Sequence, residues 1–319
     1  MRFFLALILA ALALDALAQA YPSRPVRVMV GFAPGGPNDI IARAYAARLG
    51  ESFGQPFVVE NRTGAAGNLA AEAVARAAPD GHTLMLGSTG TNAVNPTLYA
   101  NLAFDLLRDL TPVSVVATSP GALAVHPKVP AQDVRELISL ARAQPGKLTY
   151  ASAGSGSSQH LSAELFKQAT GADIVHVPYK GAAPSITDLL AGQVDMSFAP
   201  VANVVPLAKA GKLRLLGVTS AARSSFAPGT PTIAESGVPG FDVTTWYAFF
   251  STAATAADIV NRLNAELRKI AQTPQLKEQL ANLGIDAAAS ASPAEARAYR
   301  DAEAERWGKL VRALGVKAE

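Results

Sequence analysis

Residues 27–37 read RVMVGFAPGGP, and this stretch decides the fold. Its first six residues form a β-type run, and the proline and glycine residues that follow break the strand. From Pro37 onward the apolar residues take helical spacing, with Ile41, Tyr45 and Leu49 four positions apart. The stretch therefore predicts a strand, a glycine-rich loop and a helix, which together form the repeating unit of an α/β sheet.

The same unit recurs along the chain in two series. In the first series, expected strands at 57–61 and 83–87 flank an expected helix at 68–77. The second series begins beyond Ala122, and its expected elements occupy 123–125, 133–143, 148–151, 161–169, 174–177, 184–192, 194–199 and 213–219. Strands that alternate with helices of this length predict mainly parallel sheets flanked by helices. Two such series predict an α/β fold with two similar lobes.

The last part of the chain is helical and is expected to pack back on the first lobe. Apolar residues at 259–270 share one helical face, and residues 292–295 (SPAE) form a capping box with proline at the first helical position. We expect the chain to cross between the lobes near Ala122 and again at 246–251, and two crossings of this kind form a hinge. The predicted division is 21–122 plus 250–319 for lobe 1 and 123–249 for lobe 2.

Residues 1–20 have the pattern of a secretory signal peptide. Arg2 precedes an almost unbroken apolar run at 3–14, and residues 18–20 (AQA) match a cleavage site before Tyr21. The alternative is a membrane anchor, but the run is too short to cross a hydrocarbon core of about 30 Å, and Asp15 interrupts its end. The prediction is export to the periplasm.

Composition excludes several classes of protein. The chain has no cysteine, so a disulfide framework, a thiolate metal site and a lipoprotein anchor through cysteine are excluded. The net charge is +3, and Lys and Arg are scattered rather than gathered in the basic stripe that nucleic-acid binding needs. The histidines, at 82, 126, 160 and 176, do not have the spacing of metal ligands on a helix. We expect no nucleic-acid partner, no metal and no cofactor.

Two loops of the first series follow predicted strands, which is where open α/β sheets bind ligands. Residues 34–39 read PGGPND, and the glycines allow the backbone to approach a ligand closely. The helix start behind them offers free N–H groups and a positive dipole end to an anion. Asp39 has an alternative role as a cap of that helix. Residues 87–92 read GSTGTN and offer hydroxyl and amide donors, although an ordinary polar turn has the same composition.

A third loop has the same position in the second series. Residues 154–160 read GSGSSQH, and Gln159 stands where a dinucleotide fingerprint has its third glycine. The order Gly-x-Ser-x-Gly of a nucleophile elbow is also absent. His160 has two alternative roles, as a general base or as a residue that packs or caps within its helix.

The fourth loop, at 178–182, reads PYKGA. Tyr179 can stack on a solute or donate a hydrogen bond to it, and Lys180 can supply a charge or be solvated. Asp195 follows on the next predicted strand, and there a ligand role and a structural role are equal alternatives.

Seven short segments occur in one order along the chain from Tyr21. They are 21–27 (YPSRPVR), 32–36 (FAPGG), 58–62 (VVENR), 79–84 (PDGHTL), 150–154 (YASAG), 177–181 (VPYKG) and 192–195 (GQVD). Together they resemble the Bug family, the periplasmic solute receptors of tripartite tricarboxylate transporters. Each segment is short, but the ordered set is specific. The chain departs from the family at 31–34, where relatives often have a second proline, and the tip of the loop at 87–92 varies among relatives.

The resemblance implies a two-lobed periplasmic binding protein fold with the ligand cleft between the lobes. It implies a small carboxylate ligand, held by loop amides, hydroxyls and waters, and the membrane subunits of a transporter as partners. We expect a monomer. The residues that the resemblance places in the site are Phe32, Gly35, Gly36, Asp39, Ser88, Thr89, Asn92, Ser155, Gly156, Ser157, His160, Tyr179, Gly181 and Asp195.

Three functions are consistent with these features. The first is a binding protein that captures di- or tricarboxylates, acidic amino acids or aromatic carboxylates for a transporter without catalysis. The second is a receptor with a sensory role. The third is a secreted hydrolase with Ser155 or Ser157, His160 and Asp195, but here serine and histidine share one loop–helix junction rather than separate elements. We therefore predict that the chain is not an enzyme.

Overall fold

The computed structural model describes residues 21–99, 101–179 and 182–315, so the predicted signal peptide lies outside the described residues. The strands are β1 (Val26–Val30), β2 (Phe57–Asn61), β3 (Thr83–Ser88), β4 (Leu110–Val125), β5 (Leu148–Ser152), β6 (Ile174–Pro178), β7 (Met196–Pro200), β8 (Arg214–Val218), β9 (Thr244–Thr252) and β10 (Asp286–Ala287). The helices are α2 (Pro37–Phe53), α3 (Asn68–Ala75), α4 (Asn95–Leu98), α5 (Val134–Ala143), α6 (Ser158–Thr170), α7 (Ala182–Leu190), α8 (Val201–Lys209), α9 (Ala257–Ala271), α10 (Pro274–Ala281) and α11 (Pro293–Leu314).

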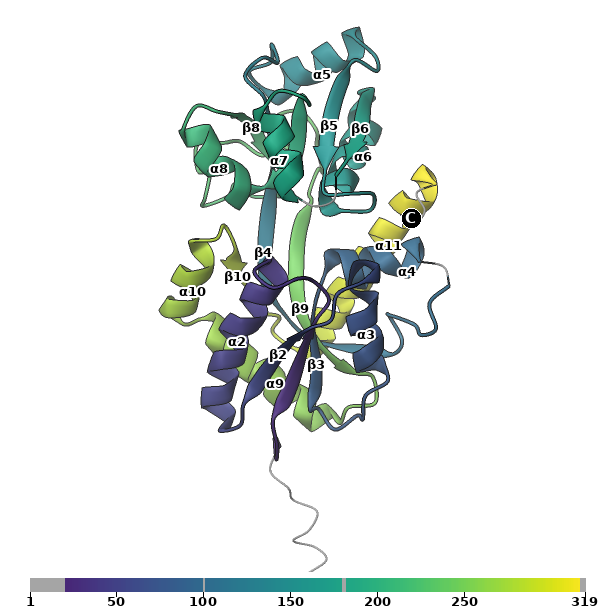
Figure 1. Cartoon of the computed structure of the whole chain (residues 1–319), viewed down its shortest axis with the longest axis vertical. Coiled ribbons are helices and arrows are strands. Elements are labelled where there is room, and N and C mark those ends of the chain that lie inside the picture. The colour runs from purple at the N-terminus through teal and green to yellow at the C-terminus, as the bar shows by residue number, and fades with distance from the viewer. Residues whose placement is uncertain (1–20, 100, 180–181, 316–319) are drawn as a thin grey trace, which may run out of the picture.

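The strands form one long mixed sheet with the order β2-β1-β3-β9-β4-β7-β5-β6, and β8 and β10 pair with β4. The trio β2, β1 and β3 is parallel, and so is the trio β6, β5 and β7. Between the trios, β9 and β4 run antiparallel to each other and to the strands beside them. The predicted two-lobed α/β fold is confirmed, with antiparallel strands joining the parallel ones. Figure 1 shows lobe 1, with β1–β3, below lobe 2, with β5–β8.

The two antiparallel strands connect the lobes (Figure 1). Residues 110–120 of β4 pair with β9, and residues 121–125 pair with β7 and β8. β9 pairs with β4 from Thr244 onward, so the second connection between the lobes includes β9. The expected position, 246–251, lies within this connecting strand, where residues 247–251 also pair with β3. The exact division at 122/123 and 249/250 stays a prediction.

Thr219 ties the two crossings together. Its Oγ1 accepts a hydrogen bond from the Gly121 N–H at 2.9 Å and donates one to the Val243 carbonyl at 2.6 Å. The Val243 N–H in turn donates to the Thr219 carbonyl at 2.7 Å. Gly121 leaves room for this contact, because a Cβ atom there would lie 3.0 Å from Thr219 Oγ1. One buried threonine therefore fixes the spacing of the two connections at the hinge.

Helix α11 begins at the expected cap. The Ser292 Oγ accepts a hydrogen bond from the Glu295 N–H at 3.1 Å, and Pro293 takes the first helical position. The Glu295 carboxylate reaches back to the Ala291 N–H at 2.8 Å, one residue before the partner that a capping box predicts. Gly315, with a left-handed backbone, ends the helix.

Helix α11 also braces the two lobes. One apolar cluster covers a face of the whole sheet and includes Met85 of lobe 1, Phe166 of lobe 2 and Trp307 of α11. The opposite faces have separate clusters, one beneath α2 and α9 in lobe 1 and one beneath α7 and α8 in lobe 2. The lobes are therefore continuous on the α11 side, and the opposite side is where a cleft can form.

Glu303 fastens α11 to β9. Its Oε2 accepts hydrogen bonds from the indole N–H groups of Trp246, at 3.2 Å, and Trp307, at 2.9 Å. Arg306 donates to the other oxygen at 3.3 Å. Trp246 and Trp307 are the chain's two tryptophans, and both are fully buried.

We predict that Glu303→Ala destabilises the fold by about 2 kcal/mol or more, because it leaves two buried indole N–H groups without an acceptor. The control is Glu305→Ala on the same helix, which removes an exposed carboxylate paired with Lys309 and should change stability by less than about 0.5 kcal/mol. Urea denaturation followed by tryptophan fluorescence measures both. Equal stability of the two variants would contradict the role of Glu303.

Candidate functional site

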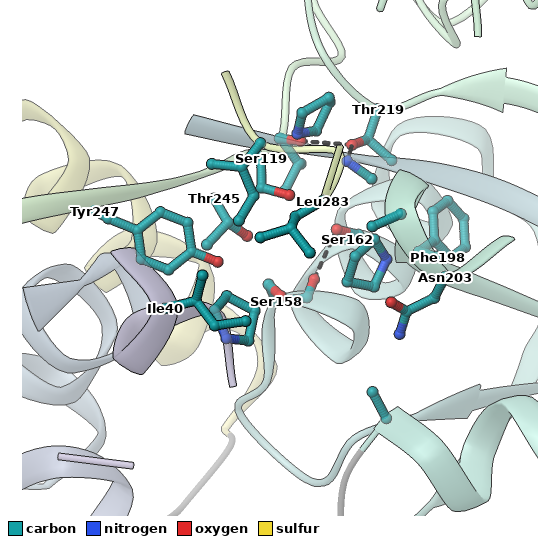
Figure 2. A pocket seen from close by; sticks show the side chains of 18 of the residues that line it. Ile40, Ser119, Ser158, Ser162, Phe198, Asn203, Thr219, Thr245, Tyr247 and Leu283 are labelled. Carbon is teal, nitrogen blue, oxygen red and sulfur yellow. Dashed lines mark hydrogen bonds between the residues drawn. The ribbon is translucent and has the colours of Figure 1, made fainter. Parts of the chain in front are cut away.

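A cavity of about 420 Å³ lies between the lobes, on the face opposite α11. Figure 2 shows side chains of both lobes around it. The described residues that line it are Gly35, Pro37, Ile40, Ser119, Pro120, Gly121, Ser158, Ser162, Ala182, Phe198, Pro200, Ala202, Asn203, Thr219, Val243, Thr245, Tyr247, Asn282, Leu283 and Ile285. The hinge strands β4 and β9 form its floor, so any movement of the lobes changes its shape.

The first turns of four helices reach this cavity. Pro37 begins α2, Ser158 begins α6, Ala182 begins α7, and Ala202 is the second residue of α8. The N-cap residues of α2 and α8, Gly36 and Pro200, have no side chain that accepts a hydrogen bond from the helix N–H groups. Free N–H groups and the positive ends of helix dipoles favour an anion. Helix N-termini from both lobes converge on the cavity, and this arrangement favours an anion.

The cavity lining, in the part of the chain that the structure describes, contains no Asp, Glu, Lys, Arg or His. Its polar groups are neutral hydroxyls and amides, contributed by Ser119, Ser158, Ser162, Asn203, Thr219, Thr245, Tyr247 and Asn282. The rest is apolar and includes Ile40, Phe198 and Leu283. Such a lining can solvate a carboxylate with neutral donors, each hydrogen bond to the charged group contributing about 1.5–3 kcal/mol, and can cover an apolar body beside it.

Asp39 shapes the first glycine loop from inside lobe 1. Gly35, whose φ is +83°, donates its N–H to Asp39 Oδ2 at 3.0 Å. Asn61 Nδ2 donates to Asp39 Oδ1 at 2.9 Å and to the Phe32 carbonyl at 3.0 Å. The hydrogen bond from Arg43 is the main reason that the pKa of Asp39 is lowered to about 2. Asp39 is therefore ionised, and both of its carboxylate oxygens accept hydrogen bonds from these partners. These contacts are those of a residue that shapes its own loop.

His160 shapes the third loop in a similar way. The Ser157 Oγ accepts a hydrogen bond from the His160 N–H at 3.3 Å, so Ser157 caps α6. The Gly156 N–H donates to His160 Nδ1 at 3.0 Å, which requires that nitrogen to be unprotonated. The His160 ring stacks on His176 with a centroid distance of 4.2 Å, and Ser152 Oγ lies 2.7 Å from His176 Nε2. His160 is thus a positioning residue for the loop that leads to Ser158.

Burial keeps this histidine pair neutral. Burial is the main cause that lowers the pKa of His160, which is 6% exposed. Burial, followed by the neighbouring His160, lowers the pKa of His176 to about 4. A proton on either ring would place a charge in the stack, and a proton on His160 Nδ1 would break the Gly156 hydrogen bond.

The second loop of the sequence prediction lies inside lobe 1 rather than on the cavity. Ser88, Thr89 and Asn92 are buried. Thr89 Oγ1 accepts a hydrogen bond from the backbone N–H of Trp246 at 2.9 Å. Both polar atoms of the Asn92 carboxamide lack a hydrogen-bond partner among the described residues. Of the three, Thr89 is the one whose side chain bonds to the hinge strand β9.

The fourth loop is only partly described, because Gly181 lies outside the described residues. The Tyr179 hydroxyl donates to Asp188 Oδ2 at 2.7 Å. Burial and this bond raise the pKa of Tyr179 to about 12. The ring packs against the lobe 2 cluster beneath α7 and α8, which is a structural placement.

Asp195 lies at the wrong end of its strand to reach the cavity, which corrects the prediction. It immediately precedes β7, and its Oδ2 accepts from the Thr149 N–H at 2.7 Å and Thr149 Oγ1 at 2.9 Å near the start of β5. Lys128 pairs with Oδ1 at 3.2 Å. These are the amino-terminal ends of parallel strands, whereas the cavity lies at the carboxyl-terminal ends.

Of the predicted residues, Gly35 is the one that the described cavity lining includes. Phe32, Gly36, Ser155, Gly156 and Ser157 belong to the two loops that lead to the lining residues Pro37 and Ser158. The residues that sequence reasoning missed follow other strands: Asn203 follows β7, and Thr219 follows β8. The rule that ligands bind beyond the carboxyl ends of strands, applied to every predicted strand, would have selected both.

Two further findings concern other classes of protein. No helix in the described ranges is both long and apolar enough to cross a bilayer. Among the same residues, no three His, Asp or Glu side chains gather as they would around a metal ion.

Two α/β lobes that are joined by two strands and enclose an anion-favouring cavity define a periplasmic binding protein fold. The family model described as tripartite tricarboxylate transporter family receptor matches residues 41–316. Protein BugT of Bordetella pertussis is 37% identical over 309 residues, which cover 97% of this chain and 94% of BugT. The chain belongs to this receptor family, as the ordered segments predicted.

Solved structures agree with this assignment. An R. palustris protein with adipate is 38% identical with a TM-score of 0.81, over 93% of this chain and 99% of that one. MatC from Rhodopseudomonas palustris, with bound malate, is 34% identical with a TM-score of 0.77, over 91% and 100% of the two chains. The family comprises solute-binding receptors rather than enzymes, so the hydrolase alternative is excluded.

The histidine stack predicts a pH dependence of stability. Unfolded histidines titrate near 6.5, and the folded pair titrates lower, so the unfolded chain binds more protons between those values. The free energy of unfolding should therefore reach its highest value above about pH 6.5 and fall as the pH decreases toward about 4. His176→Phe, which keeps a flat ring, should reduce that fall.

Urea denaturation between pH 7 and pH 5 measures the effect, with His126→Phe as the control that removes a histidine outside the stack. A His176→Phe variant that loses as much stability as the parent over this range would contradict the account.

Proposed function

We propose that the protein captures a small carboxylate in the periplasm and delivers it to the membrane subunits of a tripartite tricarboxylate transporter. The observation that carries this proposal is the cavity between the lobes, which gathers four helix N-termini and neutral donors. The adipate and malate in related structures support a carboxylate as the ligand.

Capture would proceed by closure of the lobes about the hinge. Thr219 and the strands β4 and β9 fix the axis, while α11 keeps the lobes together on the far side. A ligand that contacts Pro37 or Ile40 of lobe 1 and Ser158 of lobe 2 stabilises the closed form, because only that form makes both sets of contacts. The membrane subunits would then recognise the closed, ligand-bound conformation in preference to the open one.

Export follows from the first residues. We infer that residues 1–20 direct secretion and are removed before Tyr21, on the basis of the apolar run and the AQA site. Membership in a periplasmic receptor family supports this inference.

A thermal-shift screen tests the ligand class. At about one hundred times its dissociation constant a ligand adds about 2.7 kcal/mol of stability, which raises the melting temperature by several degrees. We expect a shift with at least one member of a panel of adipate, malate, citrate, aspartate, nicotinate and phthalate, and none with the matching uncharged amides.

A cavity variant locates the binding. Ser158→Tyr places a large side chain in the cavity and should abolish the shift, while Ser139→Tyr, on an exposed position of α5, should retain it. A rise in melting temperature with the amides alone would contradict the proposal. A rise with a carboxylate that persists in Ser158→Tyr would contradict it as well.

A further inference from the structure

Tyr247 presents an unsatisfied hydroxyl to the cavity. Its side chain is only 5% exposed and lines the cavity, and its hydroxyl has no hydrogen-bond partner among the described residues. Figure 2 shows this hydroxyl directed into the cavity between Ile40 and Thr245. The hydroxyl oxygen is open to the cavity rather than fully buried, so it can donate to water or to an acceptor that enters there.

The other buried tyrosines make the contrast clear. Tyr21 donates to the Gly81 carbonyl at 2.8 Å, Tyr45 to the Val116 carbonyl at 2.7 Å, and Tyr150 to Glu164 at 2.7 Å. Burial raises the pKa of Tyr247, so its hydroxyl keeps its proton at neutral pH and is available as a donor. Tyr247 is therefore a donor that can serve a hydrogen-bond acceptor in the cavity.

The position of Tyr247 shows which part of a ligand it meets. It belongs to β9 and approaches from the lobe 1 side, whereas Asn203 and the starts of α6, α7 and α8 approach from lobe 2. Figure 2 shows Tyr247 and Asn203 on opposite sides, with Leu283 between them. A ligand whose charged end lies at the lobe 2 helix N-termini places an apolar body against Leu283 and its far end near Tyr247.

We propose that Tyr247 donates a hydrogen bond to a second acceptor at the far end of the ligand, which makes the preferred ligand an acid with two polar ends and an apolar middle. This inference rests on the proposed function, because it takes the carboxylate to be the first polar end. A straight-chain dicarboxylate satisfies both ends, and the monocarboxylate of equal length satisfies only one.

The test compares adipate with hexanoate by isothermal titration calorimetry on the wild-type protein, Tyr247→Phe and Tyr45→Phe. We expect wild type to bind adipate more tightly than hexanoate. Tyr247→Phe should weaken adipate binding roughly tenfold to hundredfold, the range for a hydrogen bond to a charged group, and change hexanoate binding less than about twofold. Tyr45→Phe removes an identical hydroxyl from the same lobe, outside the cavity, and should change neither affinity.

Equal losses for both acids in Tyr247→Phe, or no loss for either, would overturn the inference and leave the proposed function standing. Hexanoate binding as tight as adipate binding in the wild type would overturn it in the same way. Failure of every carboxylate to bind the wild type would overturn the proposed function as well, so the two failures are distinguishable.

Discussion

The antiparallel pairing of β4 with β9 is the constraint on which the rest of the structure depends. These two strands carry the chain from one parallel trio to the other, and Thr219 fixes their separation at the crossing. Because the trios lie on either side of this pair, the carboxyl ends of their strands face a common space. Helices α2, α6, α7 and α8, which follow four of those strands, therefore begin at the cavity, and their N-termini favour an anion there.

The site gains its charge preference from the backbone. No acidic or basic side chain lines the cavity among the described residues, and the ionised Asp39 is occupied by Gly35, Asn61 and Arg43. Helix dipoles and N–H groups are fixed by the fold, so they need little reorganisation when an anion arrives. The side chains around the ligand are then free to vary in shape, which suits a receptor scaffold that serves several carboxylates.

Much of the fold followed from periodicity, since RVMVGFAPGGP and its later counterparts mark the parallel strands and the helices after them. The connecting strands did not follow, because only 123–125 of β4 was expected and β9 was not expected as a strand. The exact point at which the chain changes lobe did not follow either, because 244–252 is one largely buried strand in which no residue marks that change. The site was harder to predict than the fold. Loop composition identified the loops that lead to Pro37 and Ser158, but His160 and Asp195 have chemistry-bearing side chains that the fold uses for structure. Tyr247 was missed because it lies within a strand, where a tyrosine resembles a core residue.

A crystal structure of the protein with adipate tests the central claim most directly. The account predicts one carboxylate of the ligand between the lobes, within hydrogen-bond distance of backbone N–H groups in the first turns of the converging helices and of neutral hydroxyls. A ligand bound outside the cavity, or one whose carboxylate is held mainly by a lysine or arginine side chain, would contradict it.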